Sequence, residues 1–102
     1  MTGPAEDLLP QLPVPPDAGP LPGPEERAAR WSQLNRRAQL SVHPAGDATY
    51  SLYADHPLVR AELATLAAAE AAEHPELEIA ALVGDGHLVL AVRPRPGIAA
   101  LS

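Results

Sequence analysis

Prolines crowd the first quarter of this 102-residue chain. Eight of its thirteen prolines fall within residues 1–24, namely Pro4, Pro10, Pro13, Pro15, Pro16, Pro20, Pro22 and Pro24. Proline fixes φ and lacks the N–H donor, so this density disfavours both a helix and a sheet ladder. We therefore expect residues 1–24 to be a disordered, proline-rich leader that is dispensable for folding, and residues 25–102 to form a single domain.

The pattern becomes helical directly after the leader. Pro24 and the two glutamates that follow it are typical of a helix start, because proline suits the first turn and carboxylates favour the positive end of the macrodipole. Apolar side chains then recur at helical spacing, which predicts a helix over about residues 25–37. We expect Trp31, the only tryptophan, to be substantially buried and packed against a later, longer helix or the sheet.

Alternating residues predict a β-hairpin next. Apolar and polar side chains alternate over Leu40–Val42 and again over Thr49–Tyr53, and the turn-forming residues Pro44–Asp47 lie between these two runs. The spacing predicts a hairpin loop of four or five residues.

A second helix is expected over Pro57–Glu73. Asp55 is a plausible N-cap, and Pro57 falls in the first turn, where its missing N–H costs nothing. The run that follows is rich in alanine, the strongest helix former. Pro75 is expected to end the helix, because the residue before a proline is disfavoured in the α region.

The last two strands are predicted at Leu77–Val83 and Leu88–Val92, joined by a tight Gly-Asp-Gly turn, and residues 97–102 leave room for at most one helical turn. The order is therefore α-β-β-α-β-β. It predicts an α+β domain in which a four-stranded antiparallel sheet carries its helices on one face. The other face of such a sheet is half exposed or meets a partner.

The charge pattern argues against nucleic-acid binding. The net charge is −6, with 13 acidic residues against seven basic ones, all arginine. Four of the arginines cluster at Arg27, Arg30, Arg36 and Arg37, where nearby glutamates favour a solvated helix face.

Cysteine and a membrane-spanning apolar run are both absent from the sequence. We expect a cytoplasmic protein that binds neither membrane nor cofactor. A core without phenylalanine and rich in alanine buries little area per side chain, so a partner subunit would help, and we expect a homo-oligomer.

Glu73 and His74 are the candidate catalytic residues. The four histidines are too scattered along the chain for a metal site, and none is expected. His74, however, follows the second helix and has glutamates on both sides. Helix C-termini and carboxylates both favour a protonated imidazole, which suits general acid–base chemistry. The alternative is that His74 is a surface residue that caps the helix.

The long alanine-rich helix that ends in His74-Pro75, followed by strand, turn and strand, resembles the pterin-4a-carbinolamine dehydratases. The resemblance covers about residues 28–97, with Glu73 at the place of the first histidine of the family's His-His-Pro motif. It implies a dehydratase-like protein, active or degenerate, that acts on a 4a-hydroxytetrahydropterin. In that reading His74 is the acid–base group, Glu73 orients it or shares its proton, and subunits assemble through their sheets.

The same region is also similar to a small domain appended to some bacterial mercury-type metalloregulators. That domain has Cys-Cys-Pro where this chain has Glu73-His74-Pro75, so soft-metal sensing is not implied. Both resemblances point to the same architecture. The alternative function is a non-catalytic binding or assembly module that pairs through its sheet with another subunit.

Overall fold

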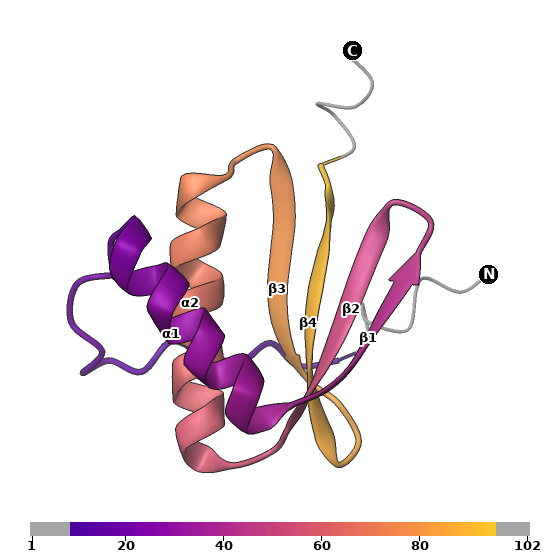
Figure 1. The fold of residues 1–102 in the computed structure, drawn as a ribbon, viewed down its shortest axis with the longest axis horizontal. Helices are drawn as coiled ribbons and strands as arrows, with labels where there is room; N and C mark the ends of the chain where they lie inside the picture. The colour runs from indigo at the N-terminus through magenta and orange to yellow at the C-terminus, as the bar shows by residue number, and fades with distance from the viewer. Residues whose placement is uncertain (1–8, 96–102) are drawn as a thin grey trace.

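The predicted α+β architecture is confirmed by the computed structural model of the chain, which describes residues 9–95. The elements follow in the predicted order: α1 (Pro24–Ala38), β1 (Gln39–Ala45), β2 (Ala48–Ala54), α2 (Pro57–Glu73), β3 (Leu77–Val83) and β4 (His87–Pro94). The four strands form one antiparallel sheet in the order β1-β2-β4-β3 (Figure 1).

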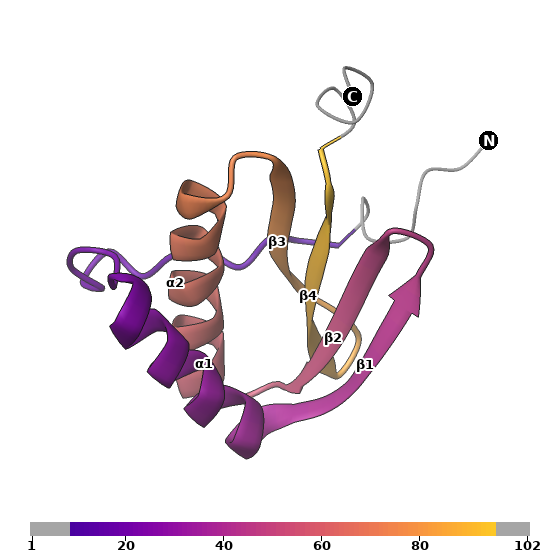
Figure 2. The same ribbon diagram turned by 45° about the horizontal axis from the view of Figure 1, so that its top comes forward.

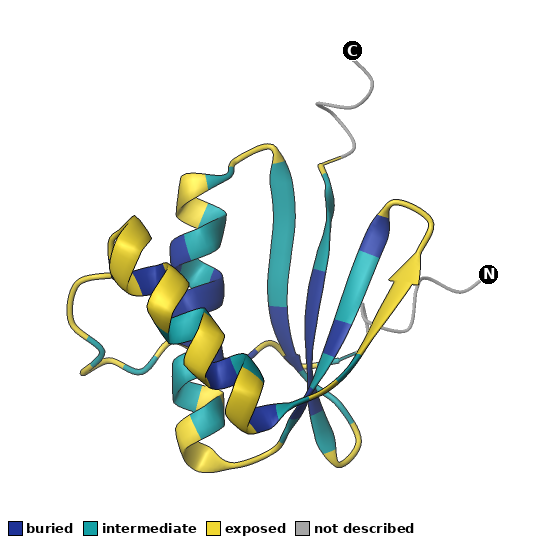
Figure 3. Cartoon of the chain, in the orientation of Figure 1, coloured by how far each residue is buried: buried dark blue, intermediate teal, exposed yellow. Residues whose placement is uncertain are grey.

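The two helices lie together on one side of the sheet. Figure 2 shows α2 beside β3, with α1 packed against α2, while the β1–β2 hairpin extends away from both helices. The core lies between these layers, where Tyr53, Leu63, Leu66 and Leu88 are each less than 2% exposed. Figure 3 shows the same division, with exposed positions over most of α1 and at the tip of the β1–β2 hairpin and buried positions along α2 and in the middle of the sheet.

The β1–β2 hairpin is tighter than predicted. Ala45 pairs with Ala48, so the loop holds two residues rather than four or five. Gly46 has a φ of 64°, a conformation that glycine adopts without strain and that two-residue hairpin loops require. Pro44 stays within β1 because this is an edge strand, where a missing N–H breaks no ladder bond.

The bounds predicted for α2 are confirmed, but its N-cap is not Asp55. His56 occupies the cap position, and its Nδ1 accepts a hydrogen bond of 3.1 Å from the Leu58 N–H. The Asp55 carboxylate instead binds Arg60 at 2.7 and 2.8 Å. These hydrogen bonds lower the pKa of Asp55 and outweigh the opposing effect of desolvation.

The prediction that the leader forms no hydrogen-bonded structure is wrong for Pro10–Leu12. Gln11 forms an antiparallel bridge with Leu82, flanked by hydrogen bonds of 2.8 Å from Leu12 N–H to Ala81 C=O and from Val83 N–H to the Pro10 carbonyl. The reason is local. Pro10 needs only its carbonyl for this pairing, and the next two residues are not proline.

The side chain of Leu12 anchors this segment. Leu12 is only 8% exposed and belongs to the cluster of buried residues between the helices and the sheet. Leu9 packs on the opposite face of the sheet, against a smaller cluster that includes Leu82. We call residues 9–12 the N-terminal strap, because they run antiparallel along the edge of β3 with one leucine on each face of the sheet.

Residues 1–8 and 96–102 lie outside the described part of the chain, and so do the predictions of leader disorder at the N-terminus and of a last helical turn. Within residues 9–95, neither helix is long and apolar enough to cross a membrane.

Candidate functional site

His74 lies at the C-cap of α2, as the sequence pattern predicts. Its backbone N–H donates to Glu70 C=O at 2.9 Å, and its carbonyl accepts from Leu77 N–H at 3.0 Å, which carries the chain from helix to strand. The ring lies between two carboxylates, with Nε2 3.5 Å from Glu70 Oε1 and Nδ1 3.3 Å from Glu76 Oε2. The side chain is 42% exposed.

Glu73, the second predicted site residue, contacts a different partner. Its Oε1 accepts from Arg27 Nη2 at 3.2 Å. The contacts described for His74 are with Glu70 and Glu76. The helix thus directs Glu73 toward α1 and His74 toward the start of β3.

Arg27 is buried, which corrects the prediction of a fully solvated arginine face. It is 7% exposed, and its guanidinium binds Glu70 at 2.8 Å, Glu73 at 3.2 Å and the Pro22 carbonyl at 3.1 Å. Burial lowers the pKa of Arg27, but the hydrogen bonds and charges of the two glutamates outweigh it and raise the pKa overall. Of the four arginines in the cluster, Arg36 and Arg37 are exposed and Arg30 is half-buried.

Glu70 is the central acceptor of this network. Its Oε2 accepts from both Arg27 Nε at 2.8 Å and Trp31 Nε1 at 2.9 Å, while its Oε1 faces His74. Trp31 itself is half-buried and packs against the core.

Arg27, Trp31 and Glu70 were not predicted as site residues. The sequence carries a signal for them, since Arg27 and Trp31 are four apart on α1 and Glu70 and Glu73 are three apart on α2, so each pair shares a helix face. What the sequence does not give is that these two faces meet.

A second ion pair joins the helices farther along. Arg30 binds both carboxylate oxygens of Glu62, at 2.8 and 2.6 Å, and Glu26 at 3.1 Å. The hydrogen bond to Glu62 is the main cause of a raised pKa at Arg30. The contact between α1 and α2 therefore combines two ionic contacts, Arg27 with Glu70 and Glu73 and Arg30 with Glu62, with the buried apolar cluster that both helices share.

Three cavities in the described chain bear on a substrate site. One of about 750 Å³ lies between α1 and α2, one of about 440 Å³ follows the edge of β3, and one of about 190 Å³ lies beside Arg27 and Glu73. His74 lines none of these three cavities. The candidate acid therefore lies between two carboxylates and outside these three cavities.

The remaining histidines hold local structure. His43 Nε2 lies 2.8 Å from Ser41 Oγ, and His87 Nδ1 lies 2.9 Å from Asp85 C=O. Among the residues that the structure describes, no group of three or more histidines and carboxylates is placed to hold a metal ion.

Comparison with known proteins adds no relative. Neither the family models, nor the curated proteins, nor the solved structures gave a match to this chain. The resemblance to pterin dehydratases stays a hypothesis that rests on the residues quoted above.

Proposed function

We propose that this domain is a non-catalytic assembly module that pairs through its sheet with a second copy of itself. The observation that carries the proposal is the surface of β1. Two large apolar side chains of the described sheet are more than a third exposed, Leu40 at 62% and Val42 at 48%, and both belong to this edge strand.

The charge of β1 supports a self-complementary contact. Edge strands are commonly protected from pairing by charged side chains. The sequence of Gln39–Ala45 holds no Asp, Glu, Lys or Arg, although the chain as a whole has a net charge of −6. Two copies can therefore bring their β1 strands together without local repulsion between carboxylates.

The geometry limits where such pairing takes place. A bulge lies between Gln39 and Ser41, and Pro44 lacks an N–H, so regular bonding is confined to the middle of the strand around Val42. Antiparallel pairing about a two-fold axis at this point is isologous, and it brings the exposed side chain of Val42 next to its own counterpart. The exposed apolar area of Leu40 then adds to a short backbone contact.

The mass of the protein in solution tests the proposal. Light scattering after size exclusion should give about twice the chain mass of 10.7 kDa at high concentration. Val42→Arg should return the mass to that of a monomer, because it places two like charges at the axis. Leu58→Arg is the matched control, since Leu58 is 75% exposed but lies on α2, and it should leave the dimer intact. A wild-type protein that is monomeric at every concentration contradicts the proposal.

Dehydration of a 4a-hydroxytetrahydropterin is the second candidate function. It is favoured by the position of His74, whose two ring nitrogens each face a carboxylate, as suits a group that donates and recovers a proton. We rank this candidate second because His74 lines none of the three cavities in which a substrate could bind.

A rate measurement separates the two candidates. Loss of a general acid lowers turnover by ~10²–10⁴-fold, so His74→Ala should have that effect, while His43→Ala should match the wild type. Glu73→Gln tests whether the neighbouring carboxylate contributes. A wild-type rate equal to the spontaneous reaction excludes the enzyme.

A further inference from the structure

The outer edge of β3 is only half covered. The strap bonds to Ala81 C=O and Val83 N–H, so odd-numbered residues of β3 turn their backbone groups outward. The bonds at the two ends of the β3–β4 ladder support this assignment. Gly84 N–H donates to His87 C=O, and Arg95 N–H donates to Glu76 C=O. Even-numbered residues of β3 therefore direct their backbone groups toward β4, and odd-numbered residues direct theirs away from it.

Ile79 is the outward-facing residue of β3 for which neither backbone group has a hydrogen bond among the described residues. Farther along the edge, Leu77 N–H already donates to His74 C=O, and Leu77 C=O accepts from Arg95 Nη2 at 3.3 Å. Within residues 9–95, no hydrogen bond is described for the outward N–H and C=O of Ile79. An N–H and a C=O side by side on a strand edge are what an added strand uses.

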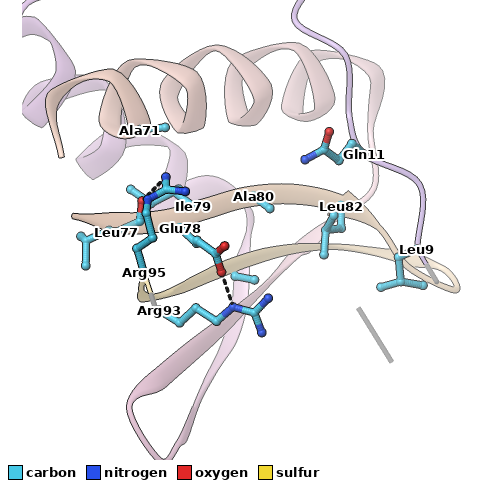
Figure 4. A pocket seen from close by; sticks show the side chains of 11 residues that line it. Leu9, Gln11, Ala71, Leu77, Glu78, Ile79, Ala80, Leu82, Arg93 and Arg95 are labelled. Carbon is cyan, nitrogen blue, oxygen red and sulfur yellow. Dashed lines mark hydrogen bonds and ion pairs between the residues drawn. The ribbon is translucent and has the colours of Figure 1, made fainter. Parts of the chain in front are cut away.

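A groove gives access to these groups. The cavity of about 440 Å³ along β3 is lined by Ile79 and by the strap residue Gln11, and α2 contributes Ala71. Figure 4 shows Gln11 near one end of the groove and Arg95 near the other, with Ala80 between them. The three residues from Glu78 to Ala80 span ~10 Å, the length of about three residues of extended chain.

Arg95 places a positive charge at one end of the groove. Among the described residues that line it, the Glu78 carboxylate binds Arg93 Nε at 2.8 Å, whereas the guanidinium of Arg95 binds only the backbone carbonyls of Pro75 and Leu77. Arg95 lies over the end of β3, with Nε 2.9 Å from the Pro75 carbonyl. The charge of this wall favours an anionic partner.

We propose that this groove binds an extended peptide segment that carries a carboxylate. The peptide adds as a short strand at Ile79, continuing the line of the strap, and its carboxylate lies at Arg95. The site is separate from the β1 surface and does not depend on self-association.

Fluorescence anisotropy tests this site with a fluorescein-labelled peptide of alternating valine and threonine that ends in aspartate with a free C-terminus. Saturable binding is expected. N-methylation of the central valine removes the N–H that reaches Ile79 C=O, and replacement of both carboxylates by amides removes the charge. Each change should weaken binding by about tenfold or more, the usual cost of a lost hydrogen bond with a charged or buried partner. Peptides with only one carboxylate removed show whether Arg95 binds the aspartate side chain or the C-terminal carboxylate.

Two protein variants complete the test. Arg95→Gln should weaken binding about tenfold, whereas Arg37→Gln, which removes an exposed arginine at the far end of α1, should change it by less than about twofold. The proposal is overturned if the parent peptide does not bind, if the N-methylated peptide binds equally well, or if both variants weaken binding to the same extent.

Discussion

At Arg27 one buried cation holds three segments of the chain together. Its guanidinium binds Glu70 and Glu73 of α2 and the carbonyl of Pro22 just before α1. Replacement by Met keeps much of the volume but leaves two facing carboxylates without their cation, so we expect the Tm of Arg27→Met to fall by several degrees.

Arg27→Lys should fall nearly as far, because an ammonium cannot reproduce the planar fork that spans the two carboxylates. Arg37→Met is the control, since Arg37 is exposed on the same helix. Equal melting temperatures for the variants at positions 27 and 37 would show that the network contributes no stability.

Tyr53 combines a buried ring with a hydroxyl that has partners. The residue is 1% exposed, and its hydroxyl donates to Asn35 Oδ1 at 2.6 Å and accepts from Gln39 Nε2 at 3.4 Å. Tyr53→Phe leaves the half-buried Asn35 carbonyl without this donor. We expect a loss of ~1–2 kcal/mol in the free energy of unfolding at neutral pH, measured by denaturant titration.

The same tyrosine predicts an alkaline limit to stability. Burial raises the pKa of Tyr53, with a smaller opposing effect of the Gln39 hydrogen bond. The neutral phenol is therefore favoured in the fold, while the unfolded phenol ionises near pH 10. The stability due to this difference is complete below about pH 10 and declines as pH rises toward the raised pKa. Wild type should lose stability more steeply than Tyr53→Phe above that pH, and parallel curves would contradict this.

For single residues, the sequence predicted the place of a residue along its helix better than it predicted which side chains that residue contacts. His74 was placed correctly at the end of α2, and Trp31, predicted to be substantially buried against α2 or the sheet, packs against the core and bonds to Glu70 of α2 but is half-buried. The burial of Arg27 was missed because a charged residue on an amphipathic helix normally faces water, and only the opposing glutamates of α2 reverse that preference.

Among the elements, α2 and β3 were predicted most closely. Pro57 and Pro75 fix the ends of α2, and Gly84 and Gly86 flank the turn that ends β3. Each of these prolines and glycines acts through its own backbone geometry, so its effect on the end of an element can be predicted from the local sequence. The strap was missed because its structure comes from a distant strand and not from its own sequence.

The strap gives a prediction at the level of this element. Leu12 is 8% exposed within the main core cluster, so Leu12→Ala should lower the free energy of unfolding by ~2–3 kcal/mol. Leu21→Ala is the matched control from the same proline-rich stretch, because Leu21 is 44% exposed and its truncation should have almost no effect. Equal stability of the two variants would show that the leader is a tail, as its composition alone suggests.

For the whole molecule, protection from hydrogen exchange should follow the distance from the helices. Residues 42–47 of the β1–β2 hairpin are exposed, whereas the middle of β4 is buried beside β2 and β3. At low protein concentration, amides near Val42 should exchange well before those of Leu88–Leu90. Protection near Val42 that grows with concentration would accompany pairing of two β1 strands; equal protection in both regions at all concentrations would contradict the prediction.

The strand order shows where sequence reasoning stops at this scale. The two hairpins could be predicted from turns and alternation, but not that β2 pairs with β4 to give β1-β2-β4-β3. The strand order depends on which edge strand of each hairpin pairs with the other hairpin beneath α2. Such a contact joins segments that lie far apart in the chain.

The strap also fixes an order of events during synthesis. Gln11 leaves the ribosome early, but its partner Leu82 follows about 70 residues later, and the strand edge does not exist until β3 is made. Leu12, which fills part of the core, therefore stays exposed while most of the domain is translated. A nascent chain that ends before Leu82 should lose its leader to a protease, and one that extends past β4 should keep residues 9–12 intact.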